Sequence, residues 1–147
     1  MQSKPENITL ISSESKSLII SVKSAKRAKL IQDFFNDFPY DEMILNLFDY
    51  TTLNKIKDYL DHYKDIEPKE ILFPLPNKDF KNCVDDWDLK YINLDNIEDI
   101  FKIMNAANFL NIEPLVNLTC AKIASLIKGK NPAEIRNLFN LSMKRKD

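Results

Sequence analysis

The residues that could do chemistry are few, and their spacing does not bring them together. The sequence holds one histidine, His62, and two cysteines, Cys83 and Cys120. A Cys–His nucleophile needs both side chains within hydrogen-bond reach and a third group that orients the histidine. Nothing in the sequence places His62 beside either cysteine, so we expect a surface histidine and, at Cys120, a small hydrophobic core residue. The two cysteines also lack the spacing of a disulfide framework or a zinc site.

Metal and phosphate chemistry are not predicted either. Asp85, Asp86 and Asp88 cluster beside Trp87, but a calcium loop needs alternating acids, a central glycine and a terminal glutamate. We therefore expect a solvated acidic turn. Loops that hold phosphate need glycines so that backbone N–H groups can approach the ligand, and the sequence has a single glycine, Gly129. No cofactor, no metal and no catalytic residue are expected, so we predict that the chain is not an enzyme.

The charge balance argues against a nucleic-acid or membrane partner. Lys and Arg number 21 and Asp and Glu 22, which gives a formal net charge of -1. Basic residues gather at 23–29 and 144–146, without interleaved aromatic residues, and we expect them to be solvated. No apolar run approaches the roughly 18 residues that span a bilayer, and MQSKPENITL does not look like a signal peptide. We expect a reducing location, cytosol or nucleus.

The first half of the chain predicts a small sheet with helices. Its 147 residues suit one domain. Alternating apolar residues at 8–10 and 18–22 predict a hairpin, although its turn lacks Asn-Gly or Asp-Gly. Helical spacing follows over 25–38 and ends at Pro39, EMILNLF predicts a buried strand, and 51–64 predicts a helix capped by a threonine. Residues 65–86, with three prolines, predict a long mobile loop. Its segment ILFPL either docks back on the domain or serves as a linear binding motif.

The second half predicts helices with unusually clear ends. A helix begins near Asp95, where Glu98 would complete a capping box. The helix from Pro114 to Lys128 is apolar nearly all round, which requires neighbours nearly all round. Gly129 follows as a C-cap, and residues 131–134 (Asn-Pro-Ala-Glu) cap a final helix. That last helix carries Ile135, Leu138 and Phe139 on one face, and we expect another protein to cover it.

The block NAANFLNIEPLVNLTCAKIASLIKGKNPAEIR, residues 105–136, resembles the signature of the Skp-type adaptor family of Skp–cullin–F-box ubiquitin ligases. Trp87-Asp88 before Tyr91 matches as well. The resemblance implies an α+β BTB/POZ fold, in which helices pack around a small three-stranded sheet and a C-terminal helical extension follows. Residues 1–112 would form the BTB/POZ-like domain, with the loop at about 65–86, and 113–147 a shortened F-box-binding extension.

The same resemblance implies a function without catalysis. The family bridges an F-box substrate receptor to the cullin scaffold of a ubiquitin ligase. By match to the family, Asn108 and Phe109 would contact the cullin N-terminal domain. The F-box would contact Leu118, Ile123, Leu126, Ile127, Ile135, Leu138 and Phe139. We expect a monomer or weak dimer when the protein is free, located in cytoplasm and nucleus.

Three departures from the family keep alternatives open. The family usually continues past the Phe-Asn pair with an acidic segment and a helix, where this sequence has SMKRKD. The hairpin lacks the family's Asp-Gly turn, and the central loop is partly apolar rather than acidic. The chain could therefore be a truncated competitor that binds cullin or F-box proteins and inhibits or redirects the ligase. It could also be an elongin-C-like BTB interaction module.

Overall fold

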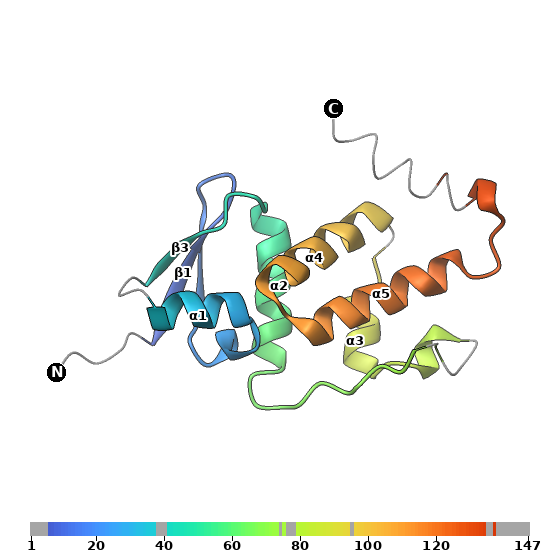
Figure 1. Ribbon diagram of the computed structural model, residues 1–147, viewed down its shortest axis with the longest axis horizontal. Helices are drawn as coiled ribbons and strands as arrows, with labels where there is room; N and C mark the ends of the chain where they lie inside the picture. Colours follow the sequence, from blue (N-terminus) through green and yellow to red (C-terminus); the bar gives the residue numbers. More distant parts are fainter. Residues whose placement is uncertain are drawn as a thin grey trace. The chain divides into compact units, whose positions relative to one another are not determined.

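A computed structural model describes residues 6–37, 41–73, 75, 79–94, 96–134 and 137 (Figure 1). The chain divides into two compact units. The first comprises residues 1–68 and 105–113, and the second residues 69–104 and 114–147. Each unit has its own buried apolar residues, and each is described by itself below. The boundary predicted at residue 112 stays a prediction.

The sheet of the first unit contains β1 (Asn7–Ile11), β2 (Ser17–Ser21) and β3 (Glu42–Ile44) in the order β2-β1-β3. β1 pairs antiparallel with β2 and parallel with β3, so Thr9 lies opposite both Ile19 and Glu42. The alternation predicted from the sequence is confirmed, because Ile8, Leu10, Leu18 and Ile20 are all buried on one face. β3 is only half buried, since its single buried residue is Met43.

The hairpin turn works without glycine because Ser12 organises it. The buried Ser12 hydroxyl accepts the backbone N–H groups of Glu14 (3.3 Å) and Lys16 (3.2 Å). Ser15 adopts the left-handed conformation with φ 62°. Glu14 Oε1 then accepts the Tyr50 backbone N–H at 2.7 Å, which lowers the pKa of Glu14. The turn is thereby tied to the start of the next helix.

The helix predicted over 25–38 is in fact two elements. Residues 24–27 form the short helix η1 (Ser24–Arg27), and α1 (Lys29–Asp37) starts after a break. Ala28 is extended, with φ -92° and ψ 92°, and its carbonyl accepts the Gln32 N–H at the first turn of α1. The break lets both Ala25 and Ala28 become buried. Helical spacing alone could not reveal it, and Pro39 lies outside the described residues.

Helix α2 (Tyr50–His62) is capped one residue before its start. Asp49 Oδ1 accepts the Thr52 N–H at 2.8 Å, so the predicted threonine cap is wrong. The Asp49 carboxylate performs the function predicted for the threonine, because it accepts the backbone N–H three residues further along the chain. Buried Leu53, Ile56 and Leu60 confirm the predicted helical face.

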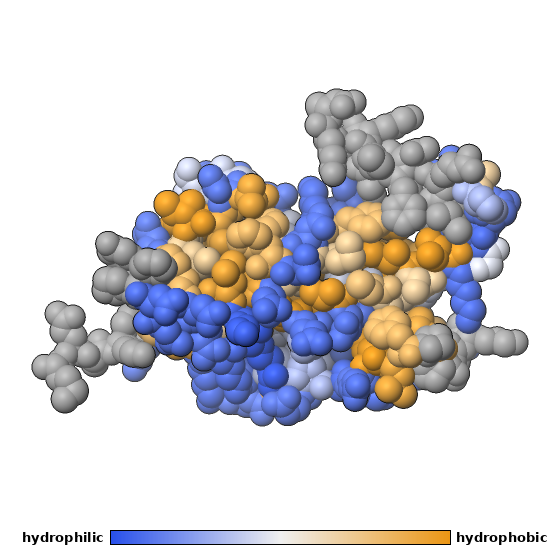
Figure 2. All heavy atoms as spheres, viewed as in Figure 1, coloured by the Kyte–Doolittle hydropathy of each residue, from blue (hydrophilic) through white to orange (hydrophobic). Residues whose placement is uncertain are grey.

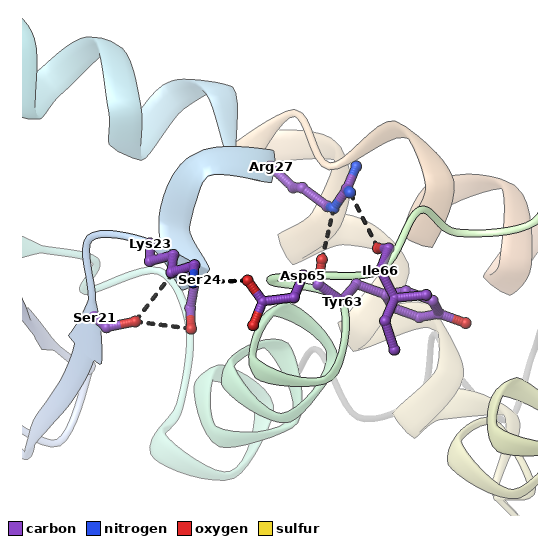
Figure 3. A network of polar contacts seen from close by, with 7 residues as sticks. All are labelled: Ser21, Lys23, Ser24, Arg27, Tyr63, Asp65 and Ile66. Atoms are coloured by element: carbon purple, nitrogen blue, oxygen red, sulfur yellow. Dashed lines mark hydrogen bonds and ion pairs between the residues drawn. The ribbon is translucent and has the colours of Figure 1, made fainter.

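Arg27 fixes the segment that leaves α2 (Figure 3). Its Nε donates to the Tyr63 carbonyl at 3.0 Å, and its Nη2 donates to the Ile66 carbonyl at 3.1 Å and to Glu67 Oε1 at 3.0 Å. Beside it, Lys23 Nζ lies 2.7 Å from Asp65 Oδ1. Both basic side chains were expected to be solvated. Lys23 is 63% exposed, as expected, but the Arg27 side chain is only 16% exposed, and both hold the η1 region to the chain after α2. We call Lys23, Arg27, Asp65 and Glu67 the Arg27 cluster.

The second unit contains η2 (Phe80–Asn82), α3 (Asp86–Tyr91), the first part of α4 (Ile97–Leu110) and α5 (Glu113–Ile127). The predicted acidic turn is wrong in part, because Asp86 lies in the first turn of α3 and Asp88 is buried. Acids are favourable in the first turn of a helix. Trp87 and Tyr91 stack with ring centroids 5.1 Å apart.

Most helix ends of the second unit lie where the sequence predicts them. At α4 the cap is Asn96, whose Oδ1 accepts the Glu98 N–H at 2.9 Å. Asp95, the predicted cap, lies outside the described residues. After α5, Gly129 has φ 76° as expected of a C-cap glycine. Asn131 Oδ1 accepts the Glu134 N–H at 2.8 Å, and Glu134 Oε1 accepts the Asn131 N–H at 3.4 Å, which confirms the predicted capping box.

Candidate functional site

The structure does not bring together His62 and the two cysteines, the residue types that a catalytic centre would need. His62 ends α2 in the first unit, where its ring lies edge-on to Tyr63. Cys83 and Cys120 belong to the second unit. Cys83 is buried, but Cys120 is exposed, with its Sγ 4.0 Å from Met104 Sδ, so the prediction of a core cysteine is wrong. Leu115, Leu118, Thr119 and Ala121 form the buried face of α5, and Cys120 lies on the side of the helix away from the centre of that face. Among the described residues, no group of three or more His, Cys, Asp and Glu side chains could hold a metal.

The first surface of interest surrounds Phe109. Phe109 lies in the last turn of α4 with 45% of its surface exposed, although part of its ring meets Phe48. The two rings are edge-on, with centroids 5.5 Å apart and an interplanar angle of 65°. Asn108 beside it is exposed, and Leu47 beside Phe48 is 72% exposed. We call Leu47, Phe48, Asn108 and Phe109 the Phe109 surface.

The end of α4 is built to hold this surface in place. Asn111 takes the left-handed conformation, with φ 60°, and ends the helix as a glycine would. The Ile112 N–H donates to the Ala107 carbonyl at 2.8 Å, and the Asn111 N–H donates to the Asn108 carbonyl at 3.2 Å. Ala107 and Leu110 are fully buried on the opposite side. The sequence indicates Asn108 and Phe109 as contact residues, but it does not indicate Leu47 and Phe48, because EMILNLF predicts a buried strand there.

The second surface is the C-terminal half of α5. In the first half of this helix, Leu115, Leu118, Thr119 and Ala121 are buried, and the Thr119 hydroxyl donates to carbonyls of its own helix. From residue 122 to residue 127 every residue is only half buried. This half contains Ile123, Leu126 and Ile127, which we call the α5 surface.

The α5 surface contains three of the residues predicted to contact an F-box. Their side chains are partly exposed, whereas Leu118 is 1% exposed and lies in the core of its unit. Ile135, Leu138 and Phe139, the other predicted contacts, lie outside the residues whose side chains the structure describes. On one side of the helix, Lys122 Nζ lies 5.4 Å from the centroid of the Phe80 ring. The apolar nature of this helix on several sides, read from the sequence, is therefore not matched by full enclosure.

The central loop divides at Ile71. Ile71 is buried, as expected if ILFPL docks back on the domain, but Leu72 and Phe73 are 59% and 51% exposed. Lys69 Nζ lies 4.0 Å from Asp85 Oδ1 in the same unit. Between His62 and Phe80 the described residues form neither helix nor strand.

A small mixed sheet with helices and two partly exposed apolar surfaces are typical of a protein-interaction module. None of the described helices has the length and apolarity needed to cross a membrane.

Residues 113–143 match the family model "Skp1 family, dimerisation domain". The chain is 36% identical over 135 residues to the S-phase kinase-associated protein 1 homolog of Tetrahymena thermophila, covering 91% of this chain and 81% of that protein. It is 32% identical over 136 residues to sconC, an E3 ubiquitin ligase complex SCF subunit of Talaromyces marneffei, covering 91% and 84%. The suppressor of kinetochore protein 1 of Schizosaccharomyces pombe is 29% identical over 141 residues, covering 91% and 84%.

The chain belongs to the Skp1 family. The predicted family and the BTB/POZ fold are confirmed by these matches together with the three-stranded sheet and its helices. Members of this family are non-catalytic, so the prediction that the chain is not an enzyme rests on its relatives and not on what the structure lacks.

Proposed function

We propose that this chain is the non-catalytic adaptor subunit of an SCF-type E3 ubiquitin ligase and bridges an F-box substrate receptor to a cullin. Relatives that carry the name of SCF subunit match 91% of the chain, which includes both surfaces described above. The observation that carries the proposal is that α5 loses its burial after Ala121 while its sequence remains apolar.

The α5 surface is our candidate for the F-box contact. Apolar surface that leaves water contributes about 25 cal/mol per Å², so a partner helix laid on Ile123, Leu126 and Ile127 would gain free energy from their burial. Leu118 would support the contact from within the core. Ile135, Leu138 and Phe139 complete the proposed set. They follow directly after the Asn131–Glu134 capping box, which starts the next helical segment.

The Phe109 surface is our candidate for the cullin contact. Aromatic residues that are partly exposed and held by a neighbouring ring are typical anchors of protein interfaces. Phe109 meets this description because Phe48 holds its ring edge-on. Asn108 can donate and accept hydrogen bonds at the rim of such a contact. Phe109 is partly exposed and the α5 surface is half buried, so a substitution at either surface should disturb the packing of the other little.

Paired substitutions with matched controls test both contacts. Ile127→Glu should weaken binding to a purified F-box protein by tenfold or more, which corresponds to about 1.4 kcal/mol, and leave binding to the cullin N-terminal domain unchanged. Lys128→Glu introduces the same residue at the next, exposed position and should have little effect. Asn108→Lys and Phe109→Ala should weaken cullin binding alone. Asn54→Lys, at an exposed position of α2, is their control.

Reconstituted ubiquitin transfer separates the adaptor from its alternatives. An adaptor restores transfer when it is added to cullin and an F-box protein, whereas a competitor lowers transfer by an intact ligase. No binding to any F-box protein, combined with a tight homodimer, would instead support an elongin-C-like module. We expect the adaptor to act in cytoplasm and nucleus, as a monomer or weak dimer when free, with neither nucleic acid nor membrane as a partner.

A further inference from the structure

The sheet of the first unit has one open edge with unusual properties. β1 is central and pairs on both sides, whereas β2 pairs only with β1. The Val22 N–H donates to the Glu6 carbonyl at 2.8 Å, and the Ser12 N–H donates to the Lys16 carbonyl at 2.9 Å. In an antiparallel pair, hydrogen-bonded positions alternate. The even-numbered residues of β2 therefore face β1 with their backbone groups.

The odd-numbered residues Ser17, Ile19 and Ser21 must then direct their backbone N–H and C=O groups away from β1. Within the part of the chain that the structure describes, none of these groups has a backbone partner. Ser17 and Ile19 are also exposed, and Ile19 shows 58% of its surface. The edge is therefore open both in hydrogen bonding and in side-chain access.

The features that usually protect a sheet edge are weak here. Edges are commonly blocked by charged residues, proline, bulges or short length. β2 has five residues and no charge, whereas β3 has three residues and carries Glu42. Two lysines flank β2, but both interact elsewhere. Lys16 Nζ lies 5.5 Å from the Tyr50 ring centroid, and Lys23 Nζ forms an ion pair with Asp65.

The sequence of β2, Ser-Leu-Ile-Ile-Ser, reads almost the same when reversed, because only Leu18 and Ile20 exchange places. If a second copy lies antiparallel with Ile19 opposite Ile19, serine faces serine at both ends. Leu18 then faces Ile20 on the buried side, and each flanking lysine faces an uncharged residue. Ile19 would gain a cross-strand apolar neighbour, which stabilises a pair by roughly 0.2–1 kcal/mol. No like charges are placed opposite each other.

The solvent-facing side of the sheet is also apolar next to the β2 edge. Thr9 lies beside Ile19 in the register, and Ile11 lies beside Ile44, which is 67% exposed. Hydrophobic residues are visible where Figure 1 draws β1 and β3 (Figure 2). Solvent-facing sides of antiparallel pairs are usually polar. Joining two copies at β2 would make one continuous strip from these residues.

We propose that two copies of this chain pair through the β2 edge, with Ile19 opposite its counterpart, to form a continuous sheet. A five-residue strand is about 17 Å long, so the contact buries well under the roughly 800 Å² per partner of a standard interface. The dimer is therefore weak, with a dissociation constant on the order of 100 µM. It uses neither the Phe109 surface nor the α5 surface, so its failure would leave the adaptor proposal intact.

Sedimentation velocity of the full chain from about 10 µM to about 1 mM tests this pairing. We expect a concentration-dependent rise from monomer to dimer, which Ile19→Lys reduces at least tenfold. Ile44→Lys makes the same change on the same sheet face, away from the edge, and should dimerise like the parent. Ser17→Pro removes an N–H that points away from β1, and should also weaken the dimer while the β1–β2 ladder persists.

Several outcomes would overturn the proposal. One is that the chain stays monomeric at every concentration tested. Another is that neither Ile19→Lys nor Ser17→Pro weakens the dimer, in variants that circular dichroism shows to be folded. Equal loss with Ile44→Lys would mean that the sheet faces pack together rather than the edges. Loss with Ile127→Glu would place the contact in the region of residues 113–143. Amide exchange gives independent support only if the Ile19 N–H becomes protected as concentration rises.

Discussion

Apolar side chains of similar size contribute to stability or to partner binding in this protein, depending on how far the surrounding residues enclose them. Leu118 is enclosed within its unit, whereas Leu126, two turns later on the same helix, is half exposed. Phe109 lies between these cases, with one part of its ring against Phe48 and another in solvent. A substitution at an enclosed position should therefore change stability, and one at a half-exposed position should change binding.

At the residue scale, we expect Leu118→Ala to lower the free energy of unfolding by about 3 kcal/mol, because it removes buried apolar surface and leaves a cavity. For a chain of this length the melting temperature should fall by about 10 °C. Val116→Ala, at a half-buried position of the same helix, is the control and should cost about 1 kcal/mol. Denaturant unfolding followed by circular dichroism measures both. Equal losses would mean that Leu118 is not enclosed as described.

The Arg27 cluster holds the segment after α2 in place through ion pairs and hydrogen bonds. Hydrogen bonds from Lys23 lower the pKa of Asp65, and those from Arg27 lower the pKa of Glu67. Both acids are exposed, so solvent weakens the pairs. Arg27 is different, since its side chain is only 16% exposed and bonds two carbonyls as well as Glu67. It is the member of the cluster that orders the chain after α2.

At the element scale, this predicts a pH dependence. Because the folded-state pKa values of Asp65 and Glu67 lie below their usual 3.8 and 4.5, the stabilisation is present above about pH 5. It is lost as the pH falls through the lowered values. The double variant Asp65→Asn, Glu67→Gln should melt below the parent at pH 6, and the difference should shrink as the pH falls below about 4.

Thermal melts of the parent and the double variant across pH 3–7 measure this difference. Glu70→Gln removes a charge in the same segment and is the control. A double variant that differs from the parent by the same amount at every pH would contradict the prediction. Glu14, whose pKa is also lowered, titrates in the same direction in both proteins and so does not affect the difference.

For the whole molecule, partner binding and stability are linked. A ligand that binds only the folded state at a hundred times its dissociation constant stabilises it by about 2.7 kcal/mol. A saturating F-box peptide should therefore raise the melting temperature by roughly 5–10 °C. Ile127→Glu should reduce this shift, measured from the variant's own free melting temperature, which falls slightly because Ile127 is half buried, whereas Lys128→Glu should keep it. An unchanged melting temperature with every F-box peptide would argue against the α5 surface as the contact.

Much of the fold could be predicted because local signals agree with the structure. The hairpin alternation, the Gly129 C-cap and the Asn131–Glu134 box are each determined by residues within a few positions of one another. Predictions failed where distant contacts decide. The break at Ala28 accompanies the contacts of Arg27 to Tyr63 and Ile66, more than thirty residues away. Asp88 was expected in a solvated turn, but it is buried within α3.

The candidate surfaces were less accessible to sequence reasoning than the fold. Periodicity marks Leu118 and Leu126 as equivalent apolar residues, and only the packing of α5 separates them. Leu47 and Phe48 look like the end of a buried strand, but β3 ends at Ile44. The family signature located Asn108 and Phe109, and the structure added the ring that holds Phe109. Contact of these residues with cullin or F-box stays a proposal.

The change in burial halfway along α5 has a consequence for the lifetime of the protein. The second half of α5, where residues 122–127 are only half buried, should open more readily than the buried half before it. Proteases and chaperones act on such openings, so copies made in excess of their binding partners would be removed first. The abundance of this subunit would then follow the supply of its receptors, without a separate control on its synthesis.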